Sequence, residues 1–206
     1  MSRLDEAILK TFPLLAAPGE GNPPEAQAYG TRFLAANDGV WREINLPWIR
    51  IRHQLAPSLL PMPYGSVGGA LELRCGPLPV EMVQAFNREA RAAAPLEIAG
   101  AFLWNRESGQ WRYGRRVALQ QTHSYIQYEE DALGEDESLV VDVHSHGHHR
   151  AFFSREDDAD DHGSMKFSLV VGNFDQDAPT SRMRLCMAGL VMPARITEEG
   201  ELEVCE

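Results

Sequence analysis

The chain has 206 residues, 44% of them hydrophobic and 24% charged, which is close to the average of globular domains and excludes wholesale disorder. Thirty acidic and nineteen basic residues give a net charge of −11, which opposes binding to nucleic acids and to anionic membrane surfaces. Three cysteines without a C-x-x-C pair are too few for a disulfide framework and favour a reducing, cytoplasmic location.

The first 79 residues predict a β-rich N-terminal extension. Residues 1–17 lack the apolar core of a signal peptide, and no stretch reaches the length of a membrane span. Asn37-Asp38-Gly39 is typical of a hairpin turn between two strands. No chemical motif is found in this extension, so its role stays open. Its strands are expected at 31–36, 40–44, 48–51 and 70–75.

The chain from 80 to 206 predicts an α+β domain with α/β-type layers. Apolar residues recur at helical spacing over 80–94, which predicts an amphipathic helix that ends before Pro95. Short apolar runs bounded by turn residues dominate the rest and are typical of strands in one sheet. Strands are expected at 98–104, 111–120, 124–129, 139–143, 166–172 and 183–192, and a short helix at 154–162.

The residues that suggest chemistry follow the expected strand at 139–143. His144 and His146 are two residues apart, so on a strand both imidazoles lie on one face and can share an ion. Ser154 and Asp157 follow in the expected short helix. Two neutral imidazoles and one carboxylate match Zn²⁺, and three protein ligands leave a fourth position open for water. We therefore predict one catalytic zinc, held by His144, His146 and Asp157.

The same segment allows other interpretations. Ser154 with an acid three residues later is also a helix N-cap in a capping box, which is compatible with a metal ligand at the same helix start. His148 and His149 show that the loop is generally rich in histidine. Asp142-Val143-His144-Ser145-His146 also mimics the start of an amidohydrolase barrel. Only sixty residues follow it, however, which are too few for that barrel.

The spacing of His144-Ser145-His146, Ser154 and Asp157 resembles the JAMM motif of the JAB/MPN metalloproteases. The resemblance covers roughly residues 80–193 and implies a JAB/MPN-like mixed β-sheet flanked by helices. That family pairs the motif with an upstream glutamate, and the segment around Glu97 is similar to its pattern.

The resemblance also implies a role for each residue. His144, His146 and Asp157 would hold Zn²⁺, and Glu97 would take a proton from water and pass it to the leaving amine. Ser154 would donate a hydrogen bond to the developing oxyanion. Glu72, in another strand-like segment, is the competing candidate for the base.

A narrower resemblance adds segments outside the motif. Pro63-Tyr64-Gly65 and Ala151-Phe152-Phe153-Ser154, taken with the JAMM residues, are similar to the PRTRC system protein A family. Those bacterial JAB-like proteins are encoded beside a ThiF-like activating enzyme, which the resemblance makes a further partner.

The function implied is a zinc-dependent isopeptidase or peptidase that cleaves after the C-terminal tail of a ubiquitin-like protein, in a precursor or a conjugate. Two alternatives stay open: a non-catalytic JAB-fold scaffold that binds a partner, and a zinc amidohydrolase that acts on a small molecule.

Carboxylates gather on both sides of the histidine pair, at 129–137 and 156–161. They would either attract a basic partner or form solvated loops. Asp158, Asp160 and Asp161 are interpreted as a solvated helix face rather than as a second metal site. Asp142 shares the strand face of His144 and is a candidate for orienting that ligand.

Overall fold

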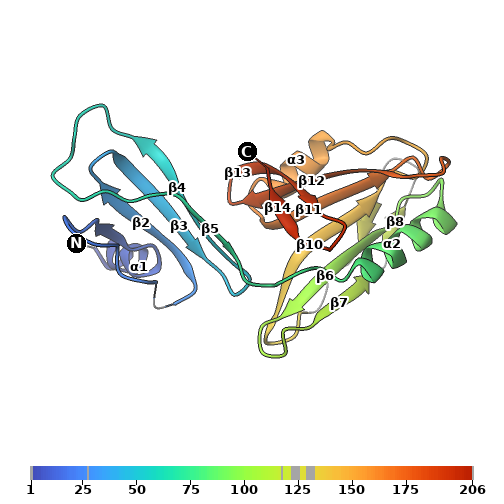
Figure 1. Cartoon of the computed structure of the whole chain (residues 1–206), viewed down its shortest axis with the longest axis horizontal. Coiled ribbons are helices and arrows are strands. Elements are labelled where there is room, and N and C mark those ends of the chain that lie inside the picture. The colour runs from blue at the N-terminus through green and yellow to red at the C-terminus, as the bar shows by residue number, and fades with distance from the viewer. Residues whose placement is uncertain (1, 27, 117, 122–125, 129–132, 206) are drawn as a thin grey trace. The chain divides into compact units, whose positions relative to one another are not determined.

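The computed structural model describes residues 2–26, 28–116, 118–121, 126–128 and 133–205 (Figure 1). The chain divides into two compact units, Met1–Arg74 and Cys75–Glu206, called here the N-terminal and C-terminal units. The sequence placed the boundary five residues later, after residue 79. No helix in the described part of the chain is long and apolar enough to cross a membrane. Glu129, Glu130 and Asp131 of the first acidic segment lie outside the described residues.

The N-terminal unit contains a five-stranded sheet with the order β1-β2-β3-β4-β5. β1 and β2 are parallel, and the other neighbours are antiparallel. The predicted hairpin is confirmed, because β2 and β3 are joined at Asn37-Asp38. Gly39 has φ +143°, and a Cβ there would lie 2.1 Å from the Ala56 carbonyl oxygen, so only glycine fits. The elements are α1 (Arg3–Thr11), β1 (Leu14–Ala16), β2 (Gly30–Ala36), β3 (Gly39–Asn45), β4 (Ile49–Pro57) and β5 (Ala70–Leu73).

The C-terminal unit contains a mixed seven-stranded sheet with the order β14-β13-β12-β11-β10-β6-β7. β10 and β11 are parallel because the chain between them crosses over through α3, and the other neighbours are antiparallel. A separate two-stranded sheet pairs β8 with β9. The elements are α2 (Val80–Ala93), β6 (Ala99–Asn105), β7 (Trp111–Arg115), β8 (Ala118–Gln121), β9 (Ile126–Tyr128), β10 (Glu137–Ser145), α3 (Arg155–Asp161), β11 (Met165–Gly172), β12 (Thr180–Met187), β13 (Leu190–Ile196) and β14 (Leu202–Val204).

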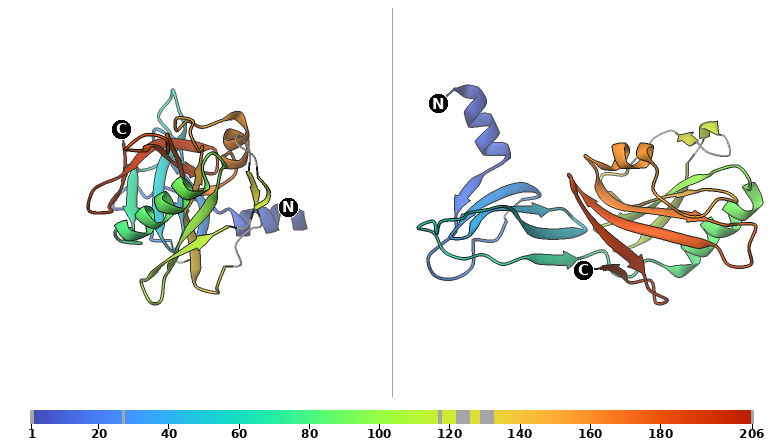
Figure 2. Two further views of the ribbon diagram at one scale, coloured as in Figure 1. Left: turned by 90° about the vertical axis from the view of Figure 1, so that its right-hand side faces the viewer. Right: turned by 90° about the horizontal axis from the view of Figure 1, so that it is seen from above.

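Helices cover both faces of this sheet (Figure 2). Phe86 of α2 packs edge-on against Tyr113 of β7, with ring centroids 6.5 Å apart, and both residues lie on the face that carries Phe102. α3 lies on the opposite face, where the Ser168 hydroxyl of β11 donates a hydrogen bond of 2.7 Å to the Asp161 carboxylate. The expected α+β class, with a mixed β-sheet flanked by helices, is confirmed.

Two expected strands each correspond to two strands in the structure. The segment expected as a strand at 111–120 contributes to β7 and β8, which lie in different sheets. The run 183–192, apolar except for Arg184, contains the turn between two antiparallel strands, β12 and β13. Ala188 and Gly189 form this turn with φ values of +49° and +90°, as a two-residue hairpin requires. A mostly apolar run does not mark a turn that is made by Ala and Gly.

Candidate metal centre

Two elements, β10 and α3, bring the predicted metal ligands together at the C-terminal end of β10. β10 supplies His144, and His146 follows directly after the strand. The first turn of α3 supplies Asp157. One ligand atom from each of these residues lies within 4.8 Å of the others. His146 and His144 are largely buried, with Nε2 atoms 3.2 Å apart.

The chemistry and spacing of these donors fit a zinc ion. Ligands bonded at about 2.0–2.1 Å to a tetrahedral ion lie roughly 3.3 Å from each other. The His144 Nε2 and His146 Nε2 atoms are separated by 3.2 Å, and His144 Nε2 lies 3.3 Å from Asp157 Oδ1. Two imidazole nitrogens and one carboxylate oxygen are also the donors that zinc prefers. This cluster can therefore hold one divalent ion.

The start of α3 explains how Asp157 can cap a helix and face the histidines at the same time. Ser154 is the N-cap, and its Oγ accepts a hydrogen bond of 3.1 Å from the Asp157 amide. Asp157 Oδ2 in return accepts a hydrogen bond of 2.6 Å from the Ser154 amide. The capping box uses only one oxygen of the carboxylate, so Oδ1 remains directed at His144.

Burial also favours the protonation state that a metal ligand needs. Burial lowers the pKa of His144, although the negative charges of Asp157 and Asp142 act in the opposite direction. Burial likewise lowers the pKa of His146, with His144 as the next contribution in the same direction. Both imidazoles are therefore held toward the neutral form, which offers a lone pair to a cation.

Glu97 lies beside this cluster because β6 and β10 are antiparallel. His144 is opposite Ala99, and continuing that register places Glu97 next to His146. Two hydrogen bonds fix the segment: Ile98 N donates to Ser145 Oγ, and Ser145 N donates to the Ile98 carbonyl, both at 2.9 Å. Burial and then the negative charge of Asp157 raise the pKa of Glu97 to about 7. A carboxyl group with that pKa can both accept and release a proton near neutral pH.

Gly147 permits the close approach between the histidine turn and the Glu97 segment. It has φ +52°, a conformation that favours glycine. A Cβ at this position would lie 2.3 Å from the carbonyl oxygen of Pro95. A larger residue here would push the segment that carries Glu97 away from the histidines.

Behind the ligands, a row of charges ties α3 to the sheet; we call Asp142, Asp161, Lys166 and Arg184 the α3 anchor. Asp142, Ser168 and Arg184 are cross-strand partners on β10, β11 and β12. Lys166 forms ion pairs with both Asp142 and Asp161. Arg184 binds Asp161 at 2.8 Å and lies 3.8 Å from the ring of Phe153. The anchor thereby holds the helix that presents Asp157.

The α3 anchor shows where two acidic residues singled out in the sequence lie, Asp161 and Asp142. Asp161 was expected on a solvated helix face, but it is buried at 4% exposure and paired with two cations. Asp158, although exposed, is also paired with Arg184. Asp142 lies on the His144 face, as expected, and forms ion pairs with Arg116 and Lys166. Five acidic residues in a helix of seven require this compensation, because like charges repel and the helix C-terminus disfavours anions.

The other candidate residues from the sequence do not belong to this metal-ligand cluster. Glu72 belongs to the N-terminal unit, is exposed and pairs with Arg74. His148, His149 and His162 are exposed. Sequence reasoning missed Lys166 and Arg184, because a single basic residue in an apolar strand does not reveal its partner.

Comparisons with known proteins divide the chain in a similar place. A family model described as prokaryotic homologs of the JAB domain matches residues 79–186. A model described as a domain of unknown function (DUF2016) matches residues 2–74. No curated protein matches the chain. Among solved structures, the solution structure of protein DSY2949 from Desulfitobacterium hafniense is similar over 61% of this chain and 86% of that one, with 17% sequence identity and a TM-score of 0.40.

Proposed function

The chain belongs to the prokaryotic homologs of the JAB domain, and on this basis we propose that it is a zinc-dependent isopeptidase or peptidase of the JAMM type. The observation that carries the proposal is the convergence of His144, His146 and Asp157, with Glu97 and Ser154 beside them. A metal site alone serves many purposes. A buried carboxyl group with a pKa of about 7 next to that site is what a hydrolytic reaction needs in addition.

In this proposal His144, His146 and Asp157 hold the zinc ion, which when bound acidifies a water molecule and polarises a carbonyl group. Glu97 accepts a proton from the attacking water and delivers it to the leaving amine. Its raised pKa lies close to neutral pH, where general acid–base catalysis is most effective.

Ser154 supplies the remaining hydrogen bond. Its Oγ already accepts the Asp157 amide, but a hydroxyl group has a donor as well as two lone pairs. The free O–H can therefore donate to the oxygen that becomes negative as the amide is attacked. One such donor is worth roughly 3–4 kcal/mol in the transition state.

The proposed substrate is the C-terminal tail of a ubiquitin-like protein, in a precursor or joined to a lysine, and the location is the cytoplasm. This substrate class follows from the JAMM resemblance. The similarity to PRTRC system protein A makes a ThiF-like activating enzyme the proposed partner in the same pathway.

A second candidate function is a non-catalytic scaffold, because a JAB fold binds partners without needing chemistry. The position of Glu97 favours the enzyme. A buried carboxyl group with a raised pKa costs stability in the ionised state, and a scaffold gains nothing from it.

The test uses the full chain loaded with zinc and a panel of ubiquitin-like proteins, each fused through its tail to a reporter domain. We expect cleavage at the end of the tail in at least one fusion. H146A should lose bound zinc and cleavage together, whereas H162A, which changes an exposed histidine, should retain both.

Three outcomes separate the candidate functions. Cleavage of the fusions but not of small amides supports the isopeptidase. Cleavage of small amides alone transfers the assignment to an amidohydrolase. Tight binding of a fusion without turnover by the zinc-loaded protein contradicts the enzyme and supports the scaffold.

A further inference from the structure

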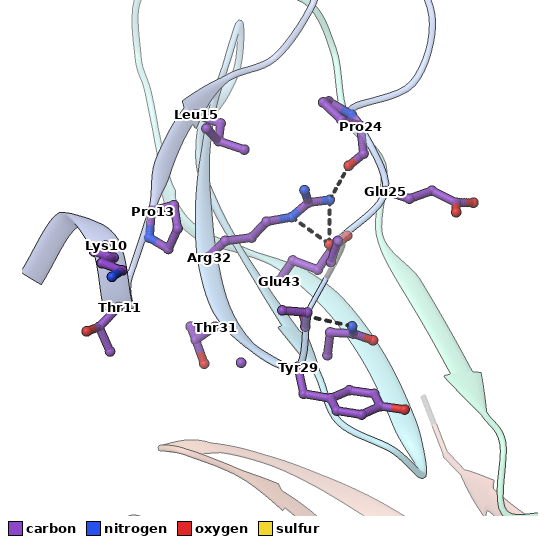
Figure 3. Close-up of a pocket in the computed structure, with 14 residues that line it drawn as sticks. Lys10, Thr11, Pro13, Leu15, Pro24, Glu25, Tyr29, Thr31, Arg32 and Glu43 are labelled. Carbon is purple, nitrogen blue, oxygen red and sulfur yellow. Dashed lines mark hydrogen bonds and ion pairs between the residues drawn. The ribbon is translucent and has the colours of Figure 1, made fainter.

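The N-terminal unit contains a cavity of about 400 Å³ on one face of its sheet. The wall is formed by α1, β1, β2, β3 and residues 24–26 and 28–30, which precede β2 or begin it. Figure 3 shows Arg32 inside this cavity, with its guanidinium group between Leu15 and Pro24 and with Glu43 on its other side. The size is within the range of small-molecule sites in proteins.

Glu43 lies at the centre of a cluster of arginines. It is fully buried, and its carboxylate forms ion pairs with Arg32 at 2.6 Å, Arg50 at 3.1 Å and Arg52 at 3.4 Å. The sheet register explains the convergence. Arg32 and Arg52 are the direct cross-strand partners of Glu43, and Arg50 lies diagonally across from it on β4.

This cluster carries more positive than negative charge. The Glu43 carboxylate is paired with three guanidinium groups. Desolvation lowers the pKa of Arg52, Glu43 opposes this shift, and the charges of Arg50 and Arg32 lower the pKa further. Glu72 is the cross-strand partner of Arg50 on β5, but it is exposed and forms an ion pair with Arg74. An anion bound in the cavity would relieve this repulsion, because buried charges of one sign are costly unless they are balanced.

Arg32 has a donor left for such an anion. Its Nε and Nη2 groups donate to Glu43, and Nη2 also donates to the Pro24 carbonyl at 2.6 Å. Within the described residues no hydrogen bond engages Nη1, although the relative exposure of Arg32 is only 8%. Lys10 lines the same cavity and adds a second cation, whereas Glu25 is an exposed acid of the lining.

The rest of the lining limits the chemistry of the ligand. Pro13, Leu15, Ala26 and Ala28 make much of the wall apolar. A phosphate dianion needs several donors around it and gains nothing from an apolar wall, whereas a monovalent carboxylate can accept a charge-assisted hydrogen bond from Nη1 alone and leaves its aliphatic body to the wall. We infer that this cavity is a binding site for a carboxylate with an aliphatic body, held at its charged end by Arg32.

The same chemistry has two sources, a free carboxylic acid and the C-terminus of a peptide, and the test distinguishes them. The isotope-labelled full chain is titrated with pentanoate and with acetyl-Leu-Gly-Gly as the free acid. Pentanamide and the peptide amide are the uncharged controls, and inorganic phosphate is the competing anion. We expect saturable shifts of the Leu15, Ala26 and Ala28 methyl signals with at least one acid, and the tighter of the two identifies the source.

Three variants assign the binding to the cavity. R32Q should weaken it by about tenfold or more, because a charge-assisted hydrogen bond is lost. A26W fills the cavity without changing the arginine cluster and should weaken it as much, so the test stands even if R32Q does not fold. R42Q is the matched control, since Arg42 belongs to the opposite face of the same sheet and donates to His53.

The inference is overturned if neither acid shifts these methyl signals, if the amides bind as well as the acids, or if phosphate binds more tightly. It is also overturned if A26W leaves the affinity unchanged. None of these outcomes depends on cleavage by the C-terminal unit.

Discussion

Glu43 and Glu97 are both buried glutamates, one in each unit, and the charges around them have opposite signs. Glu43 is fully buried among three arginines. Glu97 is 5% exposed, and its pKa is raised to about 7 by burial and by the negative charge of Asp157. The comparison shows that burial of a carboxylate does not define its role. Surrounded by cations, a buried carboxylate stays ionised and neutralises them; we call Glu43 in this role the hub. Beside another carboxylate, a buried carboxyl group has a raised pKa and can exchange protons near neutral pH.

The net charges of the two units also differ. Residues 1–74 hold seven basic and seven acidic residues, whereas residues 75–206 hold twelve basic and twenty-three acidic ones. The C-terminal unit therefore carries the entire net charge of −11. Five of its acidic residues lie in α3, where the α3 anchor neutralises part of their charge, and three of the six arginines of the N-terminal unit are paired with Glu43.

The largest effect is expected for the proton carrier. E97Q should lower turnover of the cleaved fusion by about 10²- to 10⁴-fold, because a general base is removed. Zinc content should stay unchanged, since Glu97 is not among the three clustered ligands. Elemental analysis and single-turnover kinetics measure the two quantities. E72Q is the control, and undiminished cleavage by E97Q would refute the role given to Glu97.

The corresponding change at the hub should act on stability. E43Q leaves three buried guanidinium groups without their carboxylate, which should cost roughly 3–5 kcal/mol of unfolding free energy. Urea denaturation of the full chain measures it. E72Q removes an exposed pair from the neighbouring strand and should change stability by about 1 kcal/mol or less. Equal effects of the two variants contradict the hub.

The pH dependence of stability distinguishes the two glutamates further. The pKa of Glu97 rises from 4.5 to about 7 on folding, so both states hold the proton below pH 4.5 and no penalty exists there. As the pH rises from 4.5 through 7, Glu97 ionises in the unfolded state before it ionises in the native state. The free energy of unfolding therefore falls by roughly 3 kcal/mol over this range. In the metal-free protein, E97Q should therefore gain stability over the wild type between pH 4.5 and 8. A constant difference across that range contradicts the raised pKa.

The smallest effect concerns the α3 anchor. R184Q removes the cation that pairs with Asp158 and Asp161 and should weaken zinc binding by about 10- to 100-fold, the usual effect of losing a group that positions a ligand. A chelator competition measures the affinity. R195Q, which breaks an exposed pair with Glu203, is the control and should leave it unchanged. An unaltered zinc affinity in R184Q restricts the anchor to a structural role.

Much of the architecture was predictable because local signals were strong. The helix at 80–94 follows from its apolar spacing and from Pro95, and the hairpin after β2 follows from Asn37-Asp38-Gly39. The missed helix α1 had a capping box, with Ser2 and Asp5 bonded to each other, as its signal. The turn at Ala188 has no comparable marker, since its positive φ is imposed by the pairing of β12 with β13.

The sequence by itself determined the candidate ligands, because His144, His146 and Asp157 are close along the chain and their spacing depends only on strand and helix geometry. Tertiary structure decided which distant residues join them. The antiparallel register of β6 and β10 brings Glu97 to the histidines. Cross-strand pairing likewise sets Arg184 beneath Asp161 and three arginines around Glu43. Contacts between strands far apart in sequence depend on register, and no local pattern encodes register between such strands.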